Sequence, residues 1–295
     1  MPAEFLIIAN PTSGAQRAPD LATRAIELLK RAGRNAELKL TTAPGDAGRF
    51  AREAVQHGIE VVVGCGGDGT LQEIATALES APAAMGLLPG GRCNDFAHAL
   101  GLSKRDAPDK LVNVLTNGER RKIDLGAAGN KRFLTVATLG FDSDVDRFVA
   151  NRKLWIKGTP AYIYGAIRVL LNFKFPRVKL KGDFGSVEGK VLLVATGNSA
   201  CYGGAMRIAP GAKLDDGKFQ LCIVNEVSKM TVLRIFPQVM KGKHISHPAV
   251  RLLDSSSVEI ETPDAPLSIC ADGEALCQTP CRLQIRTGVL TVLAP

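Results

Sequence analysis

Short apolar runs alternate with amphipathic stretches through the first 125 residues of the chain. Runs rich in β-branched residues are typical of strands, and apolar residues at three- and four-residue spacing are typical of helices. Regular alternation of the two indicates a parallel sheet covered by helices. We therefore expect a Rossmann-like α/β domain over residues 1–125, with strands at Phe5–Ala9, Ala36–Leu40, Glu60–Gly64, Met85–Leu88 and Lys122–Leu125 and helices at Leu21–Arg31, Ala47–Gln56 and Thr70–Leu78.

After Gly126 the pattern changes to strand-like segments separated by turn residues. This pattern predicts a β-rich second domain over residues 126–295, of the sandwich type. Helical patterns interrupt it at Ala161–Phe173 and at Met230–Met240. The expected strands are Arg132–Thr138, Arg177–Lys181, Gly189–Thr196, Phe219–Val224, Ser257–Glu261 and Leu283–Leu293.

The composition excludes several classes of protein. The apolar runs are far shorter than the roughly 20 residues that a membrane-spanning helix needs. The N-terminal residues have no basic segment and no cleavage site, so we expect a cytoplasmic protein. Seven cysteines without a C-x-x-C pair argue against a structural zinc site and against a disulfide framework.

The net charge of +8 comes entirely from Asn151–Gly182, which has eight basic residues and no acid. The remaining basic residues equal the acidic residues in number. The stretch also contains Trp155 and four other aromatic residues, a combination that favours an anionic membrane surface. A solvated basic face and a nucleic-acid surface are the alternatives. We expect peripheral attachment to the inner face of a membrane and no nucleic-acid partner.

The segment Gly64–Gly69 fits the G-x-G-x-x-G pattern of dinucleotide-binding proteins, and it follows an expected strand. A dinucleotide site also needs an acidic residue about 20 positions further on to hold a ribose. The chain has Gly86–Gly91 there, without an acid, and it has no G-x-x-x-x-G-K-[ST] segment. Neither of these common nucleotide loops therefore explains the glycines.

What remains is a strand, three glycines around Asp68 and a helix. Glycines let backbone N–H groups approach phosphate oxygens, and the N-terminus of a helix adds partial positive charge. We expect Thr70 and Glu73 to open this helix as a capping box. A carboxylate beside a polyanionic phosphate needs a cation between them, so Asp68 indicates magnesium. The alternative is that Asp68 only forms the turn.

The segment Gly66–Thr70 resembles a signature that diacylglycerol, sphingosine, ceramide and NAD kinases share, and alone it indicates only that superfamily. Further segments along nearly the whole chain resemble the diacylglycerol kinase catalytic family, and in particular its bacterial soluble lipid kinases. They are Asn10–Gly14, Leu88–Phe96, Ile123–Gly126, Tyr202–Gly217 and Asp272–Glu274.

The resemblance implies two domains with ATP in the cleft between them and a lipid hydroxyl group as the acceptor. It also implies which residues surround the nucleotide. They are Asn10, Pro11, Thr12, Ser13, Gly14, Thr42 or its neighbour Thr41, Gly66, Gly67, Asp68, Gly69, Thr70, Glu73, Arg92 and Asn94.

The acidic residues receive roles by the same resemblance. Asp68, Asp95 and Asp124 would form a network around the catalytic Mg2+ ion and its waters, and Glu274 would be the general base. A second, structural magnesium would be held by the carbonyl groups of Lys213 and Lys218 and by the carboxylate of Asp216.

The residues themselves support the role of Glu274, because an alcohol nucleophile gains from a carboxylate that accepts its proton. Glu274 belongs to the β-rich half and Asp68 to the α/β half, so the two would meet only in a closed cleft. Other interpretations remain open. Asp272–Glu274 fits a hairpin turn with two solvated acids, Asp95 fits a helix cap, and Asp215–Gly217 fits an ordinary turn.

The chain departs from the family at Arg92, where the family usually has a threonine whose hydroxyl meets nucleotide phosphate. A guanidinium group binds phosphate more strongly than a hydroxyl but is much larger. We therefore expect Arg92 to affect the pose or the affinity of the nucleotide more than the chemical step.

Two other functions compete with lipid phosphorylation. NAD kinases share the phosphate loop, and Asn225–Glu226 imitates their Asn-Glu pair, but it lies too far beyond the loop. A lipid or nucleotide sensor without turnover is the second, and retention of Asp68, Asp95, Asp124 and Glu274 argues against it. The acceptor also stays open: diacylglycerol is the default, and phosphatidylglycerol, another glycerolipid or a sphingoid base has a suitable hydroxyl. An unpaired sheet edge would support a homodimer.

Overall fold

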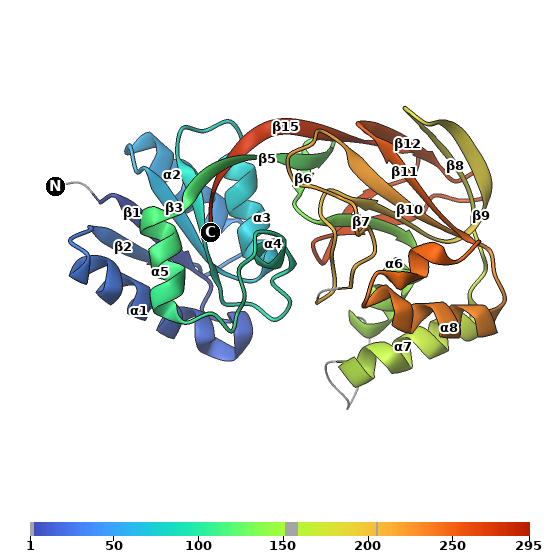
Figure 1. The fold of residues 1–295 in the computed structure, drawn as a ribbon, viewed down its shortest axis with the longest axis horizontal. Coiled ribbons are helices and arrows are strands. Elements are labelled where there is room, and N and C mark those ends of the chain that lie inside the picture. The colour runs from blue at the N-terminus through green and yellow to red at the C-terminus, as the bar shows by residue number, and fades with distance from the viewer. Residues whose placement is uncertain (1–2, 151–158, 205) are drawn as a thin grey trace.

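A computed structural model describes residues 3–150, 159–204 and 206–295 of the chain. It has an α/β lobe and a β-rich lobe, joined by two long strands (Figure 1). The α/β lobe contains β1 (Phe5–Ala9), η1 (Ser13–Gln16), α1 (Arg17–Arg31), β2 (Ala36–Leu40), α2 (Asp46–Gln56), β3 (Val61–Gly66), α3 (Asp68–Ala77), β4 (Ala84–Pro89), α4 (Asp95–Ala99) and α5 (Pro108–Asn117).

The rest of the chain forms the connection and the β-rich lobe. Its elements are β5 (Glu119–Ala128), β6 (Lys131–Phe133), β7 (Val136–Gly140), α6 (Phe141–Ala150), α7 (Thr159–Asn172), β8 (Arg177–Gly182), β9 (Gly185–Gly197), β10 (Phe219–Asn225), α8 (Lys229–Val239), η2 (Lys243–Ser246), β11 (Val250–Ser255), β12 (Ser257–Glu261), β13 (Ser268–Ala271), β14 (Glu274–Gln278) and β15 (Cys281–Ala294).

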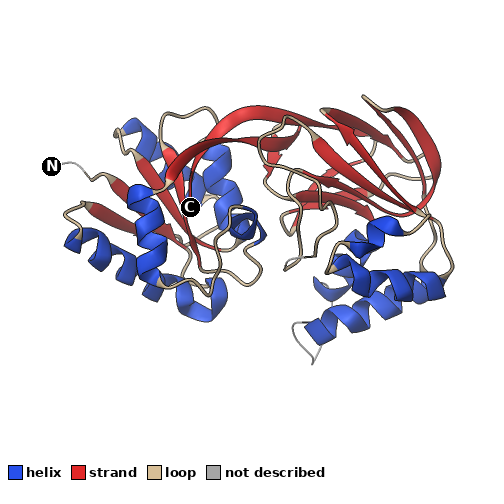
Figure 2. Ribbon diagram, in the orientation of Figure 1, coloured by secondary structure: helices blue, strands red, loops and turns tan. Residues whose placement is uncertain are grey.

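Parallel strands form the sheet of the α/β lobe in the order β2-β1-β3-β4. Every residue of β1 and of β3 is buried, as expected for strands covered by helices on both faces. Helix α1 packs beside α5, and α2 packs beside α3 (Figure 2). The predicted α/β architecture is therefore confirmed. Strand β2 ends the sheet, and its use in a homodimer stays a prediction.

The strands β5 and β15 run antiparallel and cross from one lobe to the other (Figure 1). Strand β15 pairs with β12 in the β-rich lobe, and Val292 near its end pairs with Met85 of β4. Leu290, Val292 and Leu293 are buried in the core of the α/β lobe. The C-terminal residues thus take part in the packing of the first lobe. The position of the domain boundary near residue 125 stays a prediction.

The β-rich lobe is a sandwich, as the sequence predicts. One layer contains β8, β12 and β15, and the other contains β14, β13, β7, β9, β10 and β11. Strand β9 pairs with β8 along its first half and with β7 and β10 along its second half, so it belongs to both layers. Between the layers, the rings of Phe133 and Phe219 stack with centroids 5.6 Å apart.

Helices α6, α7 and α8 lie together on one side of the sandwich (Figure 1). Val145, Leu170 and Val232, one from each helix, share a core with Leu193 and Cys222 of the sheet. The ammonium group of Lys229 at the start of α8 donates to the carbonyl of Leu171 near the end of α7. The predicted helices in this lobe are confirmed. The part of the basic stretch that contains Arg152, Lys153, Trp155 and Lys157 lies outside the described residues.

The predicted strand Arg132–Thr138 is wrong as a single element, because β6 and β7 flank Leu134 and Thr135. The amides of Leu134 and Thr135 donate to the Asp272 carboxylate, at 2.6 and 3.0 Å, and therefore leave the ladder of the sheet. Helices α5 and α6 and strands β11, β13 and β14 were not predicted from the sequence. Helix α5 begins with Pro108, which is a start signal for helices.

Among the described residues, no helix is long and apolar enough to cross a membrane. All seven cysteines fall within the described residues, and none of them forms a disulfide.

Candidate active site

Three loops leave the carboxyl ends of adjacent strands and meet at one place. They are Asn10–Gly14 after β1, Gly67 after β3 and Gly90–Asn94 after β4. The Asn10 amide donates to the Cys65 carbonyl at 3.0 Å and the Gly90 amide donates to the Gly66 carbonyl at 3.2 Å, so hydrogen bonding of the sheet continues into the loops. Open α/β sheets bind ligands at this edge.

Two glycines let these loops pack backbone against backbone. A Cβ atom on Gly14, whose φ is +60°, would stand 1.9 Å from the Gly90 carbonyl oxygen. A Cβ atom on Gly91 would stand 2.4 Å from the Cα of Gly67. The Asn94 side chain closes the third loop, because it accepts from the Gly91 amide and donates to the Gly91 carbonyl, both at 2.8 Å. The structure thus brings these predicted residues together.

An open pocket of about 640 Å³ lies against the three loops. Three basic side chains line it together with the glycines: Arg17, Arg92 and Lys104. The Lys104 ammonium donates to the Arg92 carbonyl at 2.9 Å, and the Arg17 guanidinium donates to the Lys104 carbonyl at 3.2 Å. The cations and the N-terminus of α3 favour a ligand with several negative charges, such as a triphosphate.

Asp68 is the first residue of α3 and lines this pocket. Its Oδ2 accepts from the Asn94 amide at 3.1 Å, whereas its Oδ1 is buried without a hydrogen-bond partner among the described residues. Burial raises the pKa of Asp68, and the negative charge of Asp95 raises it further. A buried carboxylate oxygen without a donor is costly, and a divalent cation would satisfy it.

Asp95 is the first residue of α4, and its carboxylate reaches the other lobe. Both of its oxygens accept from the Gly204 amide, each at 3.0 Å. Gly204 lies in the loop after β9, where its φ of +88° suits glycine. Asp95 is buried at this contact between the two lobes.

The strands β13 and β14 are joined by the two-residue turn Asp272–Gly273. The φ angles of +51° and +85° are both positive, as in the type I′ turn that Asp-Gly favours. Glu274 follows the turn, and its Oε1 lies 3.5 Å from the position that a Cβ atom of Gly69 would occupy. A carboxylate of the β-rich lobe therefore reaches the phosphate loop of the α/β lobe.

Asp272 anchors this turn. Its carboxylate accepts from the Leu134 amide at 2.6 Å, from the Thr135 amide at 3.0 Å and from the Thr135 hydroxyl at 2.5 Å. Burial raises the pKa of Asp272 to about 6, the Thr135 hydroxyl opposes the shift, and the charge of Asp68 adds to it. The interpretation of the turn as two solvated acids is therefore wrong for Asp272.

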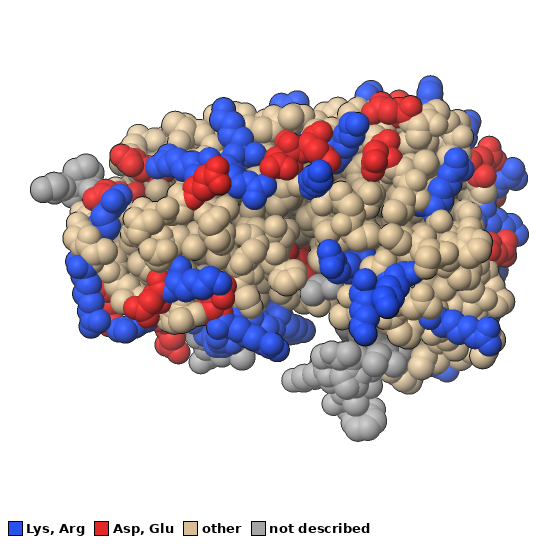
Figure 3. Space-filling view, in the orientation of Figure 1, with Lys and Arg blue, Asp and Glu red and all other residues tan. Residues whose placement is uncertain are grey.

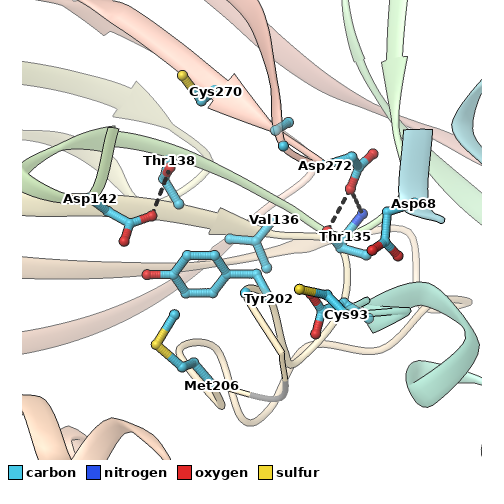
Figure 4. Close-up of a pocket in the computed structure, with 14 residues that line it drawn as sticks. Asp68, Cys93, Thr135, Val136, Thr138, Asp142, Tyr202, Met206, Cys270 and Asp272 are labelled. Carbon is cyan, nitrogen blue, oxygen red and sulfur yellow. Dashed lines mark hydrogen bonds between the residues drawn. The ribbon is translucent and has the colours of Figure 1, made fainter. Parts of the chain in front are cut away.

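We call the open pocket lined by Arg17, Arg92 and Lys104 the phosphate pocket. A second cavity of about 140 Å³ adjoins it (Figure 4). Asp68, Cys93 and Asp272 line both spaces. Figure 4 shows Asp142 at the other end of the cavity, with Tyr202 between it and Asp68. A hydroxyl group held in this cavity would have access to a phosphate beside Asp68. We call this space the acceptor cavity.

Two residues predicted at the nucleotide have other partners. The amide and the hydroxyl of Thr42 both donate to Asp46 Oδ2 at 2.8 Å, and Thr42 does not line the phosphate pocket. The predicted capping box is wrong, because α3 begins at Asp68 and Gly67 at its N-cap has no side chain to accept. The carboxylate of Glu73 instead accepts from the amides of Gly45 and Gly48, at 2.9 and 3.3 Å.

Asp124 is fully buried, and its carboxylate accepts from the Gly217 and Gly288 amides, both at 2.7 Å. It lines neither the phosphate pocket nor the acceptor cavity. These bonds fix the turn that carries the proposed second magnesium site, where Asp216 Oδ1 accepts from the Lys218 amide at 3.1 Å. Lys213, Asp216 and Lys218 are exposed there. The magnesium-related roles of all four residues stay predictions.

Several residues of the site were not singled out from the sequence. Arg17 and Lys104 lie in segments without a motif, and only the fold brings them to the phosphate pocket. Asp142 lies in α6, a helix that was not predicted from the sequence. Conversely, the pair Asn225–Glu226, which imitates an NAD kinase, lines neither of the two spaces.

The side chains at the site that could ligate a metal suit a magnesium ion that takes most of its ligands from the phosphates of the substrate. Among the described residues, no group of three or more His, Cys, Asp or Glu side chains is arranged to hold a metal ion. Mg²⁺ bound with nucleotide commonly uses only one or two carboxylates and takes its other ligands from phosphates and water. The buried Oδ1 of Asp68, beside the phosphate pocket, meets that requirement.

A parallel α/β lobe with a glycine-rich phosphate loop, and a carboxylate brought to it by a β-sandwich lobe, define a two-lobed phosphotransferase. Comparison with known proteins agrees. The family model of the diacylglycerol kinase catalytic domain matches residues 4–128, and that of the YegS C-terminal NAD kinase beta sandwich-like domain matches residues 135–294.

Individual relatives extend over the same length. A diacylglycerol kinase of Mycobacterium tuberculosis is 31% identical over 98% of this chain and 94% of its own length. One of Bacillus subtilis is 27% identical over 91% of this chain and 88% of its own. A crystal structure of a diacylglycerol kinase from Bacillus anthracis has a TM-score of 0.77 at 22% identity, covering 99% of this chain and 97% of its own. The chain belongs to the diacylglycerol kinase family, and it is an ATP-dependent lipid kinase.

Proposed function

We propose that this enzyme transfers the γ-phosphoryl group of MgATP to a hydroxyl group of a glycerolipid, with diacylglycerol as the first candidate. The observation that carries the proposal is the position of Glu274 Oε1, 3.5 Å from a Cβ site on Gly69 of the phosphate loop. A carboxylate at this place is suited to take a proton from an alcohol as it meets a phosphate. The name of the relatives supports diacylglycerol.

The phosphates of ATP lie in the open pocket, over the backbone amides of the glycine loops and the N-terminus of α3. Arg17, Arg92 and Lys104 offset part of their charge. The lipid hydroxyl enters through the acceptor cavity and gives its proton to Glu274 while its oxygen bonds to the γ-phosphorus. The bond from that phosphorus to the oxygen bridging to the β-phosphate breaks, and ADP leaves with the electron pair.

Magnesium, when bound, supplies positive charge that stabilises the phosphates as the transfer proceeds. Asp68 Oδ1 would hold it directly or through water. Asp95 lines the acceptor cavity, and its hydrogen bond with the Gly204 amide holds the two lobes together beside the site.

We also propose that the enzyme attaches to an anionic membrane surface through α7, α8 and η2. Of the nine large apolar side chains exposed in the described part of the chain, eight lie on or directly beside these elements. We call them the apolar face; they are Tyr164, Ile167, Leu171, Met230, Leu233, Phe236, Met240 and Ile245. An apolar patch bordered by polar residues is typical of membrane or protein contacts.

The charge around the apolar face complements an anionic bilayer. Residues 227–253 contain five basic side chains and no acid, and the basic stretch that includes α7 has none either. Figure 3 shows Lys and Arg side chains on both lobes beside the hollow between them. Basic residues attract anionic lipids, and exposed apolar residues beside them insert into the interface. This attachment would present the acceptor cavity to lipid substrates.

The proposal is tested by incubating the enzyme with labelled ATP, Mg²⁺ and a total bacterial lipid extract, followed by mass spectrometry of the labelled products. We expect a phosphorylated glycerolipid, and its loss in the Glu274→Ala variant. Absence of any labelled lipid from the intact enzyme would instead favour a sensor without turnover. NAD is included as a competing acceptor, and phosphorylated NAD would favour the NAD kinase alternative.

A further inference from the structure

The short strand β6 contacts both helix α3 of the α/β lobe and the β13–β14 hairpin of the β-rich lobe. Its middle residue, Arg132, meets the helix segment at two points. The Arg132 Nε donates to Glu79 Oε2 at 2.8 Å, and the side-chain amide of Gln72 donates to the Arg132 carbonyl at 2.7 Å. Gln72 lies within α3, and Glu79 lies two residues beyond its end. The side chain and the backbone of Arg132 therefore both hold β6 against α3.

The ion pair between Arg132 and Glu79 is largely enclosed, because their side chains are only 16% and 17% exposed. Solvent and salt screen such a pair much less than a pair on the surface. The second oxygen of Glu79 accepts from Arg286 Nε of β15 at 3.2 Å. One carboxylate just beyond α3 thus binds both β6 and β15, the strand that crosses between the lobes.

The same short segment also holds the hairpin that carries Glu274. Lys131, which precedes Arg132, donates through Nζ to the Ala275 carbonyl at 2.8 Å. The two amides that follow β6 donate to the Asp272 carboxylate. These hydrogen bonds reach the residue directly after Glu274 and the residue two positions before it. The place of β6 therefore determines the place of the hairpin.

Together the contacts form a closed circuit through both lobes. Gly69, in the first turn of α3, faces the Glu274 carboxylate. The far end of the same helix holds β6 through Glu79. Strand β6 in turn holds the hairpin from which Glu274 projects. The distance from Glu274 to the phosphate loop thus depends on the bonds that fasten β6 along α3.

We infer that Arg132 is a positioning residue for phosphoryl transfer, which keeps the Glu274 carboxylate at the phosphate loop by fastening β6 to α3. The inference rests on the proposed function and deepens it. Arg132 lines neither the phosphate pocket nor the acceptor cavity, so its effect on the reaction passes through Glu274. A misplacement of about 1 Å at a reacting group can cost roughly a hundredfold in rate. Loss of the fastening should therefore lower kcat, whereas the affinity for ATP should change little.

The test is a double-mutant cycle between the ion pair and the base. Glu79→Gln keeps the shape of the side chain and removes its charge, and it is made alone and together with Glu274→Gln. Labelled ATP and a short-chain diacylglycerol give kcat and the KM for ATP. For Glu79→Gln alone we expect kcat to fall at least tenfold while the KM for ATP changes less than twofold. In the Glu274→Gln background the same change should lower kcat less than twofold, because no base is left to position.

Three further variants separate positioning from a general loss of structure. Arg132→Met should behave like Glu79→Gln, and the two together should cost little more than either, because each breaks the same ion pair. Gln72→Ala removes only the bond to the Arg132 carbonyl and suits a helix, so it should fold and give a smaller loss that again needs Glu274. Glu188→Gln is the control, because its ion pair with Arg177 joins neighbouring strands of one lobe and is exposed. It should leave kcat unchanged.

Denaturant unfolding verifies that each variant is folded at the assay temperature. An unchanged kcat in Glu79→Gln, or a loss of equal size with and without Glu274, would overturn the inference, since a merely structural role lowers kcat in both backgrounds. If the variants of the ion pair do not fold, Gln72→Ala decides by the same two criteria. Failure of the proposed function appears elsewhere in the cycle, as a Glu274→Gln variant that by itself keeps the turnover of the wild type.

Discussion

Glu274 Oε1 lies 3.5 Å from the position of a Cβ atom on Gly69, although the two residues belong to different lobes. The side chain leaves the β13–β14 hairpin directly after an Asp-Gly turn that is anchored by three hydrogen bonds to Leu134 and Thr135. A general base must lie within reach of its proton before its pKa matters. The anchored turn holds the Glu274 carboxylate beside the glycine-rich loop, where the proposed base would have to lie.

The Glu274→Gln variant should lose turnover and retain nucleotide binding. General base catalysis contributes about 10²- to 10⁴-fold, so we expect kcat to fall at least a hundredfold while the KM for ATP changes less than twofold. Steady-state kinetics with a short-chain lipid measures both values. Glu259→Gln, an exposed acid of the same lobe, is the control. If kcat fell by less than tenfold, Glu274 would not be the base.

The Gly91→Ala variant should disturb the phosphate loops, because its Cβ would stand 2.4 Å from the Cα of Gly67 and backbone must move. Overpacking of this kind costs about 1–3 kcal/mol, and we expect weaker ATP binding together with lower stability. Denaturant unfolding and nucleotide titration measure the two effects. At Gly189 an added Cβ meets no atom within 4 Å, so Gly189→Ala should change neither. Equal behaviour of the two variants would contradict the close contact between Gly91 and Gly67.

The Arg92→Thr variant should remain active and bind ATP about tenfold more weakly. The guanidinium lines the phosphate pocket, and a hydrogen bond to a charged group contributes about 1.5–3 kcal/mol. The KM for ATP at saturating lipid is the measurement. Arg105→Thr removes a neighbouring charge that does not line the pocket, and it should have little effect. An unchanged KM in Arg92→Thr would mean that the side chain points elsewhere in the complex.

Protonation of Asp272 should make stability depend on pH. Its pKa of about 6 in the folded protein lies above the ordinary value of 3.8, so the folded state binds the proton more tightly than the unfolded state. The resulting stabilisation is present below about pH 4 and is lost as the pH rises through 6. The difference between a pKa of 3.8 and one of about 6 corresponds to roughly 3 kcal/mol.

Asp272→Asn removes this titration. Denaturant unfolding of both proteins without nucleotide or Mg²⁺ should therefore show the wild type losing roughly 3 kcal/mol relative to the variant between pH 4 and pH 7. A difference in unfolding free energy that stays constant over this interval would mean that the Asp272 carboxylate titrates normally.

Attachment to membranes should depend on the apolar face. Met230 and Leu233 are 64% and 48% exposed on α8, and a negative charge at either place opposes insertion next to anionic lipid. We expect Leu233→Glu combined with Met230→Glu to reduce binding to anionic vesicles at least tenfold. Leu40→Glu is matched in chemistry, because Leu40 is 45% exposed at the edge strand β2 outside this face. Co-sedimentation with vesicles gives the comparison, and equal binding of all three proteins would disprove the assignment.

Local patterns predicted the strands of the α/β lobe well. The bounds of β1 and β2 agree with the prediction, because each is a short run between clear turn residues. The same reasoning failed at Arg132–Thr138, where Phe and β-branched residues favour a strand but Asp272 accepts hydrogen bonds from two of the amides. It failed again at Thr70–Glu73, where Gly45 and Gly48 are the partners of Glu73. In both cases a distant residue competed with a local hydrogen bond.

Local features of the sequence were enough to predict the two-lobed architecture and the glycine-rich loop at Asp68, because periodicity, glycine content and motifs are local. The role of Glu274 as the general base stays a prediction. The folded structure was needed to show that Asp272 anchors its turn on Leu134 and Thr135, that Arg17 and Lys104 line the phosphate pocket, and that Asp142 lines the cavity beside it. These relationships depend on which distant segments the folded core brings together. Hydrophobic burial drives that folding without direction, so the sequence around these residues does not indicate their neighbours.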